Sequence, residues 1–173
     1  MNILVIYGSL REGSLNKALA PKEMNIELSG IEGFPLYDDK IEKTAFPEVA
    51  TKLKEKIAAA DGILVVTPEY NRSIPGSLKN ALDWTSRGKV PWKQKPVGVI
   101  GASDGVRGAS FAQYDVKKVL TYFDAHVMGQ PEFYFGEGDK KIDADGNITD
   151  EKSKTYLQKY LTAFTHHVVA QKA

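Results

Sequence analysis

The chain has 173 residues, a nearly balanced charge and no cysteine. Domains of about 100–200 residues are typical, so we expect one domain over residues 1–173. The 23 Lys and Arg against 22 Asp and Glu give a net charge of +1, which supplies no basic field for nucleic acid. Without cysteine there are no disulfides, thiolate nucleophiles or cysteine-ligated metals, which fits a reducing cytoplasm. No apolar run reaches the roughly 18 residues of a membrane-spanning helix.

Short apolar runs mark the expected strands. Residues 3–7, 63–67 and 97–100 are rich in β-branched side chains and almost continuous rather than alternating. Such runs are typical of strands that helices cover on both faces of a parallel sheet. Residues 24–28 alternate and are expected at a sheet edge, and a fifth strand is expected to start near residue 125 and resume near residue 133.

Helical patterns fill the segments between these runs. Pro47 and Pro75 suit the first turns of two helices, and apolar spacing predicts further helices over residues 112–123 and 157–168. Strands and helices thus alternate along the chain. This order predicts a three-layer, doubly wound α/β domain whose five-stranded parallel sheet has the flavodoxin-like order 2-1-3-4-5. Ligands of such sheets bind at the carboxyl ends of the strands.

The loop after the first strand, residues 8–16, has the chemistry of a phosphate site. It offers the hydroxyls of Ser9 and Ser14, the amide of Asn16 and the guanidinium of Arg11 at the expected start of a helix. Backbone N–H groups at a helix start and a guanidinium fork both favour a phosphate. The loop matches neither GxGxxG nor GxxxxGK[ST], which disfavours the usual dinucleotide and nucleoside triphosphate loops. A plain turn with Ser14 as N-cap is the alternative.

Two more loops end at the same predicted edge. Residues 67–76 carry two prolines, and such a rigid loop presents N–H and C=O groups to the edge of a flat heterocycle. The alternative is an ordinary loop with Tyr70 packed on a neighbour. Residues 101–108 contain three glycines, which permit close approach of a ligand, although a merely flexible loop is the alternative. Three such loops at one edge predict one ligand site.

Together these motifs resemble the NAD(P)H-dependent FMN reductase family, above all its quinone and chromate reductase branch. The resemblance is carried by GSLR at 8–11, PEYN at 68–71, PG at 75–76, LKNAxDW at 78–84 and the glycine loop, and it covers nearly the whole chain. It implies that the FMN phosphate lies at Ser9, Arg11, Ser14 and Asn16. It implies an isoalloxazine-facing segment at Pro68, Glu69, Tyr70 and Asn71, with Ser73 nearby, and an opposite wall with Ser103, Gly105 and Gly108.

The resemblance also implies a function. A reduced nicotinamide, NADPH or NADH, would pass hydride to bound FMN, which would then reduce a quinone, flavin, azo or metal-oxyanion acceptor by a ping-pong mechanism. This chemistry requires no side chain as acid or base, so we predict no catalytic side chain. The histidines and the acidic residues after Asp143 match no metal-ligand spacing, so we predict no metal ligand. Alternatives are a flavodoxin-like electron carrier, which the net charge and Arg11 disfavour, and a flavin-binding module without turnover.

The resemblance further implies a homodimer or homotetramer that acts on a small-molecule acceptor. The lack of cysteine fits a cytoplasmic protein, and the balanced charge and the lack of a long apolar run predict no nucleic-acid or membrane partner. Trp84 is expected either beside the flavin at a subunit contact or in packing within the chain.

One segment departs from the family pattern. Pro21 comes only five residues after Asn16. A helix over residues 15–20 would rise about 9 Å, whereas a strand of five or six residues spans about 17–20 Å. Either the first helix is short or residues are missing after Asn16. The predicted phosphate loop precedes this segment.

Overall fold

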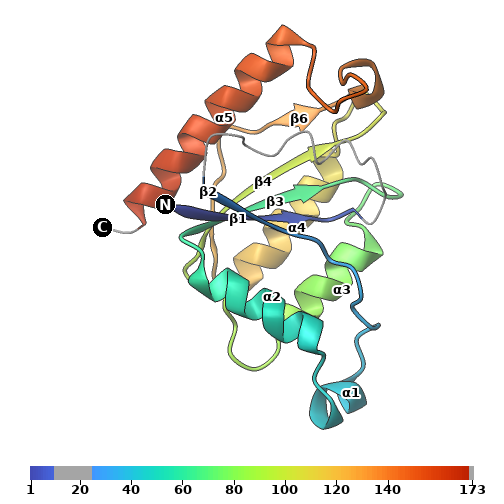
Figure 1. The fold of residues 1–173 in the computed structure, drawn as a ribbon, viewed down its shortest axis with the longest axis vertical. Helices are drawn as coiled ribbons and strands as arrows, with labels where there is room; N and C mark the ends of the chain where they lie inside the picture. The colour runs from blue at the N-terminus through green and yellow to red at the C-terminus, as the bar shows by residue number, and fades with distance from the viewer. Residues whose placement is uncertain (10–24, 172–173) are drawn as a thin grey trace.

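The computed structural model describes residues 1–9 and 25–171, and its centre is a parallel β-sheet (Figure 1). Its four longer strands are β1 (Asn2–Tyr7), β2 (Asn25–Ser29), β3 (Gly62–Thr67) and β4 (Pro96–Ala102). The strand order β2-β1-β3-β4-β5 confirms the predicted topology, with β2 at the edge. The segment between Asn16 and Pro21, whose length departs from the family pattern, lies outside the described residues.

The strand expected after residue 125 is split in two. Strand β5 (His126–Val127) pairs with the start of β4, and β6 (Tyr134–Phe135) pairs with its end. The sheet therefore has six strands where five were predicted. Pro131 lies in the intervening segment, and a proline has no N–H to donate to a strand ladder.

Four longer helices stand where the periodicity predicts them. They are α2 (Glu48–Ala59), α3 (Gly76–Thr85), α4 (Ser110–Tyr122) and α5 (Glu151–Ala170). Pro47 and Pro75 directly precede α2 and α3 as their N-caps. The short helix α1 (Asp39–Thr44) was not predicted, because none of its residues is buried and it therefore carries no apolar periodicity. None of the helices in the described ranges is long and apolar enough to cross a bilayer.

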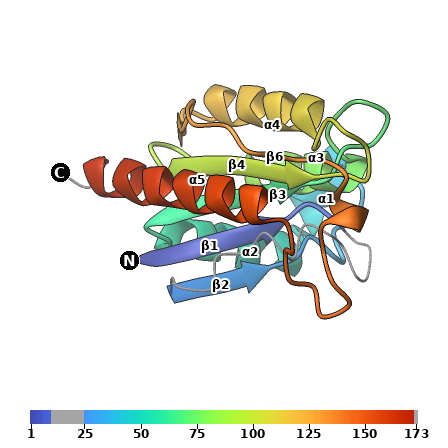
Figure 2. The same cartoon turned by 90° about the horizontal axis from the view of Figure 1, so that it is seen from above.

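The two faces of the sheet carry separate cores. Ile3 and Val5 of β1 pack in the cluster that includes the buried face of α5, whereas Leu4 and Ile6 pack in the cluster that includes α2, α3 and α4. Helices thus cover both faces, as Figures 1 and 2 show. This confirms the reason for the nearly continuous apolar runs, since every residue of β3 is buried.

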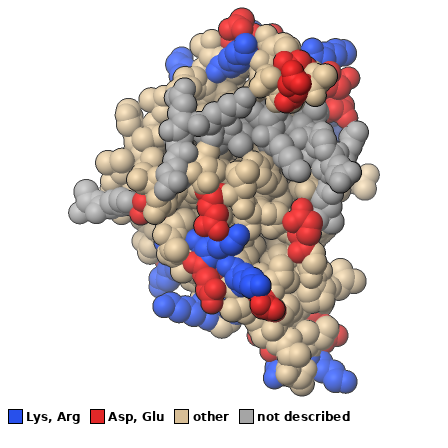
Figure 3. All heavy atoms as spheres, in the orientation of Figure 1, with Lys and Arg blue, Asp and Glu red and all other residues tan. Residues whose placement is uncertain are grey.

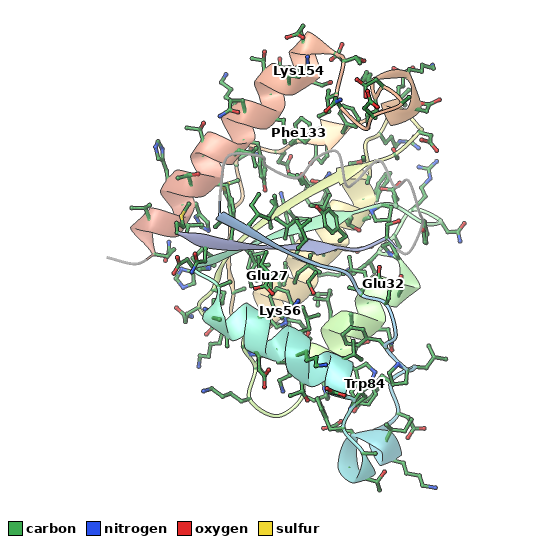
Figure 4. All side chains as sticks on the ribbon, in the orientation of Figure 1. Glu27, Glu32, Lys56, Trp84, Phe133 and Lys154 are labelled. Atoms are coloured by element: carbon green, nitrogen blue, oxygen red, sulfur yellow. The ribbon has the colours of Figure 1, made fainter. Side chains whose placement is uncertain are left out.

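The surface mixes both signs of charge. In the view of Figure 3, basic and acidic side chains lie close together in several places. One pair joins the edge strand to a helix, with Lys56 Nζ of α2 at 3.1 Å from Glu27 Oε1 of β2 (Figure 4). Exposed pairs of this kind add about 0–1 kcal/mol each.

The long helix α5 lies tightly against β4. Asp150 caps the helix by accepting a hydrogen bond from the Ser153 N–H at 2.7 Å. Burial raises the pKa of Tyr160, and its hydroxyl donates to the Val99 carbonyl at 3.1 Å. A Cβ at Gly98 would lie 2.8 Å from Tyr160 Oη and 2.9 Å from Phe164 Cδ2, so the sheet can approach the helix only because residue 98 is glycine.

We predict that Gly98→Ala lowers the free energy of unfolding by about 1–3 kcal/mol, as overpacking does in other cores. Urea denaturation followed by circular dichroism measures the effect. Gly129→Ala is the matched control, because a Cβ at Gly129 would meet nothing within 4 Å. Equal unfolding midpoints for the two variants would contradict the prediction.

Candidate functional site

The carboxyl ends of β1, β3 and β4 meet at one edge of the sheet. Tyr7 pairs with Val66, and Thr67 pairs with Gly101, so the loops that follow these strands start side by side (Figure 1). This is the edge at which ligands bind in open parallel sheets. All three loops singled out by their composition begin here.

The first loop is described only at its start. The Gly8 N–H donates to the Val66 carbonyl at 2.9 Å, and a Cβ at Gly8 would lie 2.7 Å from Leu78 Cδ2 of α3. Ser9 follows directly and is only 5% exposed. The structure thus places Ser9 at the predicted edge. The other predicted phosphate ligands, Arg11, Ser14 and Asn16, lie outside the described residues.

The second loop contains a tight two-residue turn. Tyr70 and Ser73 exchange two backbone hydrogen bonds of 3.1 Å, and the central residues Asn71 and Arg72 have φ of 51° and 65°. Two positive φ values in succession are typical of a type I′ turn. The turn carries Asn71 and Arg72 at an exposed tip. Tyr70 is 48% exposed and is therefore not buried against a neighbour.

Two side chains of this loop are fastened to α4. Glu69 Oε2 accepts hydrogen bonds from the N–H groups of Phe111 (2.8 Å) and Ala112 (3.2 Å), in the first turn of α4. The N-cap residue, Ala109, makes no side-chain cap hydrogen bond, so the Glu69 carboxylate satisfies these donors, and a negative charge is favourable at this end of a helix. The sequence assigns Glu69 to the flavin-facing segment, whereas the structure directs its carboxylate to the helix.

Ser73 makes the second contact between this loop and α4. Its hydroxyl donates to Asp115 Oδ2 on α4 at 2.6 Å. The Lys118 ammonium, and then the Ser73 hydroxyl, hold the pKa of Asp115 below its usual value. Since α4 itself follows the third loop, one helix positions two of the three loops.

The third loop is held by β6 and the segment behind it. The Ser103 N–H donates to the Phe135 carbonyl at 3.0 Å, the Ser103 hydroxyl donates to the Gly105 carbonyl at 3.0 Å, and the Glu137 N–H donates to the same carbonyl at 3.1 Å. Gly108 has φ of 56°, and its Cβ would lie 2.5 Å from Phe135 N. Residue 108 must therefore be glycine, because the chain's own backbone leaves no room for a side chain there. Around Gly105, by contrast, a Cβ would meet nothing within 4 Å.

Gln113 was missed by the sequence analysis. It is 1% exposed, and its Nε2 donates to the carbonyls of Gly108 (3.1 Å) and Phe133 (3.0 Å). This side chain therefore ties the third loop to the segment before β6. Its Oε1 has no hydrogen-bond partner among the described parts of the chain. A glutamine within the apolar stripe of a predicted helix was the signal that could have found it.

Both described loops offer donors that suit a flat, polar ring. An isoalloxazine ring presents carbonyl oxygens and ring nitrogens at its edge, which backbone N–H groups can bind. Within residues 1–9 and 25–171, several backbone N–H groups at this edge donate to no protein acceptor: those of Glu69, Asn71, Arg72, Asp104, Gly105 and Val106. The residues present therefore fit an FMN ring between the second and third loops.

Trp84 belongs to a different cluster. It is fully buried, its Nε1 donates to the Pro35 carbonyl at 2.8 Å, and the rings of Tyr37 and Phe46 lie 5.0 and 5.5 Å from it, centre to centre. Figure 4 shows Trp84 beside the segment that carries α1. Of the two alternatives for Trp84, the structure shows packing within the chain.

Comparisons with known proteins agree with this geometry. The family model described as NADPH-dependent FMN reductase matches residues 1–140. A 2-hydroxy-1,4-benzoquinone reductase of Burkholderia sp is 44% identical over 173 residues, covering 95% of this chain and 94% of the relative. A quinone reductase of Escherichia coli K12 is 40% identical over 175 residues, covering 95% of this chain and 93% of the relative.

A solved structure is also similar. The flavoenzyme FerB, an NAD(P)H:(acceptor) oxidoreductase of Paracoccus denitrificans, has a TM-score of 0.87 and 39% identity, with 98% of each chain covered. The chain therefore belongs to the NADPH-dependent FMN reductase family and is an oxidoreductase of the FMN and quinone reductase type, with FMN and a reduced nicotinamide nucleotide as its cofactors.

Proposed function

We propose that the chain reduces a small electron acceptor, above all a quinone, with electrons from NADH or NADPH by way of FMN at the carboxyl edge of the sheet. In total, NAD(P)H, a proton and a quinone yield NAD(P)⁺ and a hydroquinone. Bound FMN would supply the redox chemistry, accepting a hydride from the nicotinamide and returning two electrons to the acceptor. The observation that carries the proposal is the set of backbone N–H donors that two loops present at this edge.

The chain's own groups would bind FMN and orient its ring. The N–H groups of the second and third loops would hold the ring edge and stabilise negative charge on it. Ser9 would belong to the phosphate end of the site, together with Arg11, Ser14 and Asn16, which remain predictions. Ser103 and Gly105 would form the opposite wall, because the Ser103 hydroxyl fixes the Gly105 carbonyl and the space beside Gly105 is open.

We propose a ping-pong order in which the nucleotide leaves before the acceptor enters. Tyr70, Asn71 and Arg72 are exposed at the tip of the second loop and Val106 at the third, so both substrates would approach the ring past the same rim. No side chain of this rim is required to move a proton, because a proton from solvent reaches an open site. Flavins, azo compounds and metal oxyanions are further acceptors that such a site would admit.

We further propose that the chain acts as a cytoplasmic homodimer or homotetramer. A cysteine-free chain suits a reducing compartment. The oligomeric state is proposed from the family resemblance, because a single exposed apolar side chain such as Leu36, which is 83% exposed, is ordinary on a protein surface. Light scattering of the purified protein tests this part of the proposal.

The proposed activity predicts a yellow protein once FMN has been added. Absorbance spectroscopy is expected to show tightly bound flavin, and NADH or NADPH is expected to be oxidised rapidly only when a quinone is present. Varying both substrates is expected to give parallel double-reciprocal lines, which are typical of ping-pong order.

A chain that cannot be loaded with FMN would contradict the proposal. A chain that binds FMN but oxidises neither nucleotide would favour the electron carrier or the flavin-binding module instead.

The hydrogen bonds between Glu69 and the start of α4 give a second prediction. Glu69→Ala removes the cap of α4 and releases the second loop, so we expect the dissociation constant of FMN to rise about tenfold, or about 1.4 kcal/mol. Quenching of flavin fluorescence measures it. Glu48→Ala is the matched control, because Glu48 is also in the first turn of a helix but is exposed and forms an ion pair with Lys52 of its own helix. If Glu69→Ala bound FMN as tightly as the wild type, the hydrogen bonds between Glu69 and α4 would not shape the site, and the prediction would be wrong.

A further inference from the structure

Two arginines from different loops lie over one phenyl ring at the rim of the site. The Cζ atom of Arg72, at the tip of the second loop, is 5.5 Å from the centre of the Phe111 ring. The Cζ atom of Arg107, in the third loop, is 5.7 Å from the same centre. Phe111 stands in the first turn of α4 and is 43% exposed, and both arginines are exposed. We call these three residues the arginine rim.

Neither guanidinium of the arginine rim is neutralised. Within residues 1–9 and 25–171, no carboxylate lies within 4.0 Å of Arg72 or Arg107. Glu69 belongs to the same loop as Arg72, and its Oε2 is already bound to the N–H groups of Phe111 and Ala112. Two like charges this close to one ring repel each other, and stacking on Phe111 offsets little of that repulsion at an exposed site. An anion bound by the two guanidinium groups would relieve the repulsion.

The other described arginine shows a different arrangement. Arg87 also lies over an aromatic ring, 5.4 Å from the centre of Tyr37. Its Nε, however, donates to the Asp83 carbonyl and its Nη2 to the Ser86 hydroxyl at 2.7 Å. Arg87 is thus held by its own helix end, whereas no hydrogen bond to the described residues is made by either guanidinium group of the arginine rim.

The backbone of Arg72 adds to the contrast. Its φ of 65° lies in the left-handed region, at a turn position where glycine is the favoured residue. This conformation is unfavourable for an L residue with a side chain. The chain therefore holds an arginine at the tip of the loop at some cost, as is common where a side chain contacts a ligand.

We propose that the arginine rim recognises a phosphate group of the reduced nicotinamide nucleotide. This inference rests on the proposed function, because the rim lies where a substrate would enter to reach the ring. Guanidinium forks bind phosphate oxygens in pairs, and the exposed ring of Phe111 offers an apolar face to the nucleotide. The phosphate has two sources: the 2′-phosphate that only NADPH carries, or the pyrophosphate that NADH and NADPH share.

Direct binding tests the proposal without relying on turnover. The FMN-loaded protein is titrated by calorimetry with adenosine 2′,5′-bisphosphate, which carries the 2′-phosphate, with ADP, which carries the pyrophosphate, and with 5′-AMP, which lacks both. We expect one of the first two probes to bind more tightly than 5′-AMP. Tighter binding of the bisphosphate assigns the rim to the 2′-phosphate, and tighter binding of ADP assigns it to the pyrophosphate.

The variants are Arg72→Gly, Arg107→Ala and the two combined. Glycine suits the left-handed conformation at residue 72, so this change removes the guanidinium and keeps the turn. We expect the double variant to lose at least tenfold in affinity for the preferred probe, with KM for the nucleotide rising by a similar factor. Arg87→Ala, an arginine on an aromatic ring away from the site, is the control and should bind the probe as the wild type does.

The outcomes separate the two proposals. A wild-type protein that binds FMN and oxidises NAD(P)H, together with a double variant that binds every probe equally well, overturns the arginine rim and leaves the proposed function intact. A wild-type protein without FMN-dependent oxidation overturns the proposed function, and this inference with it.

Discussion

The parallel pairing of β3 between β1 and β4 is the constraint on which the rest of the molecule depends. All six residues of β3 are buried, so helices must cover both faces of the sheet. The connecting loops can therefore emerge only at the amino or carboxyl ends of the strands. The parallel register brings the ends of three strands to one edge of the sheet, with Tyr7 beside Val66 and Thr67 beside Gly101. A candidate ligand site assembled from three distant parts of the chain is a direct consequence of this pairing.

The sequence predicts those parts of the fold in which burial leaves a pattern. Continuous β-branched runs give the central strands, and periodic apolar spacing gives α2 to α5. Helix α1 is not predicted, because a helix that buries none of its residues has no such pattern. The split of the last strand is visible only in part, since the short ladders of β5 and β6 are set by their pairing with β4 rather than by their own composition.

The candidate site is predictable by position more than by role. Glu69 and Ser73 stand where the motif places them, yet their side chains bind α4, because a helix start offers N–H donors that a nearby carboxylate satisfies. In the sequence, Gly108 suggests space for a ligand beside the backbone. In the structure, the backbone of strand β6 fills that space. Glycine composition cannot tell the two uses apart, since both require only the absence of a Cβ. The roles of Arg11, Ser14 and Asn16 remain predictions from the motif.

The attachment of the second loop to α4 has a consequence for how such a protein can change. The walls that would hold the ring are braced by Glu69, Ser73 and Asp115, whereas the side chains of Asn71 and Arg72 lie at an exposed tip outside these hydrogen bonds. Exchange at the tip can therefore alter which molecules are admitted without disturbing the frame beneath it. Such a division lets relatives with one scaffold diverge in substrate range, and it marks the tip as the place to begin redesign.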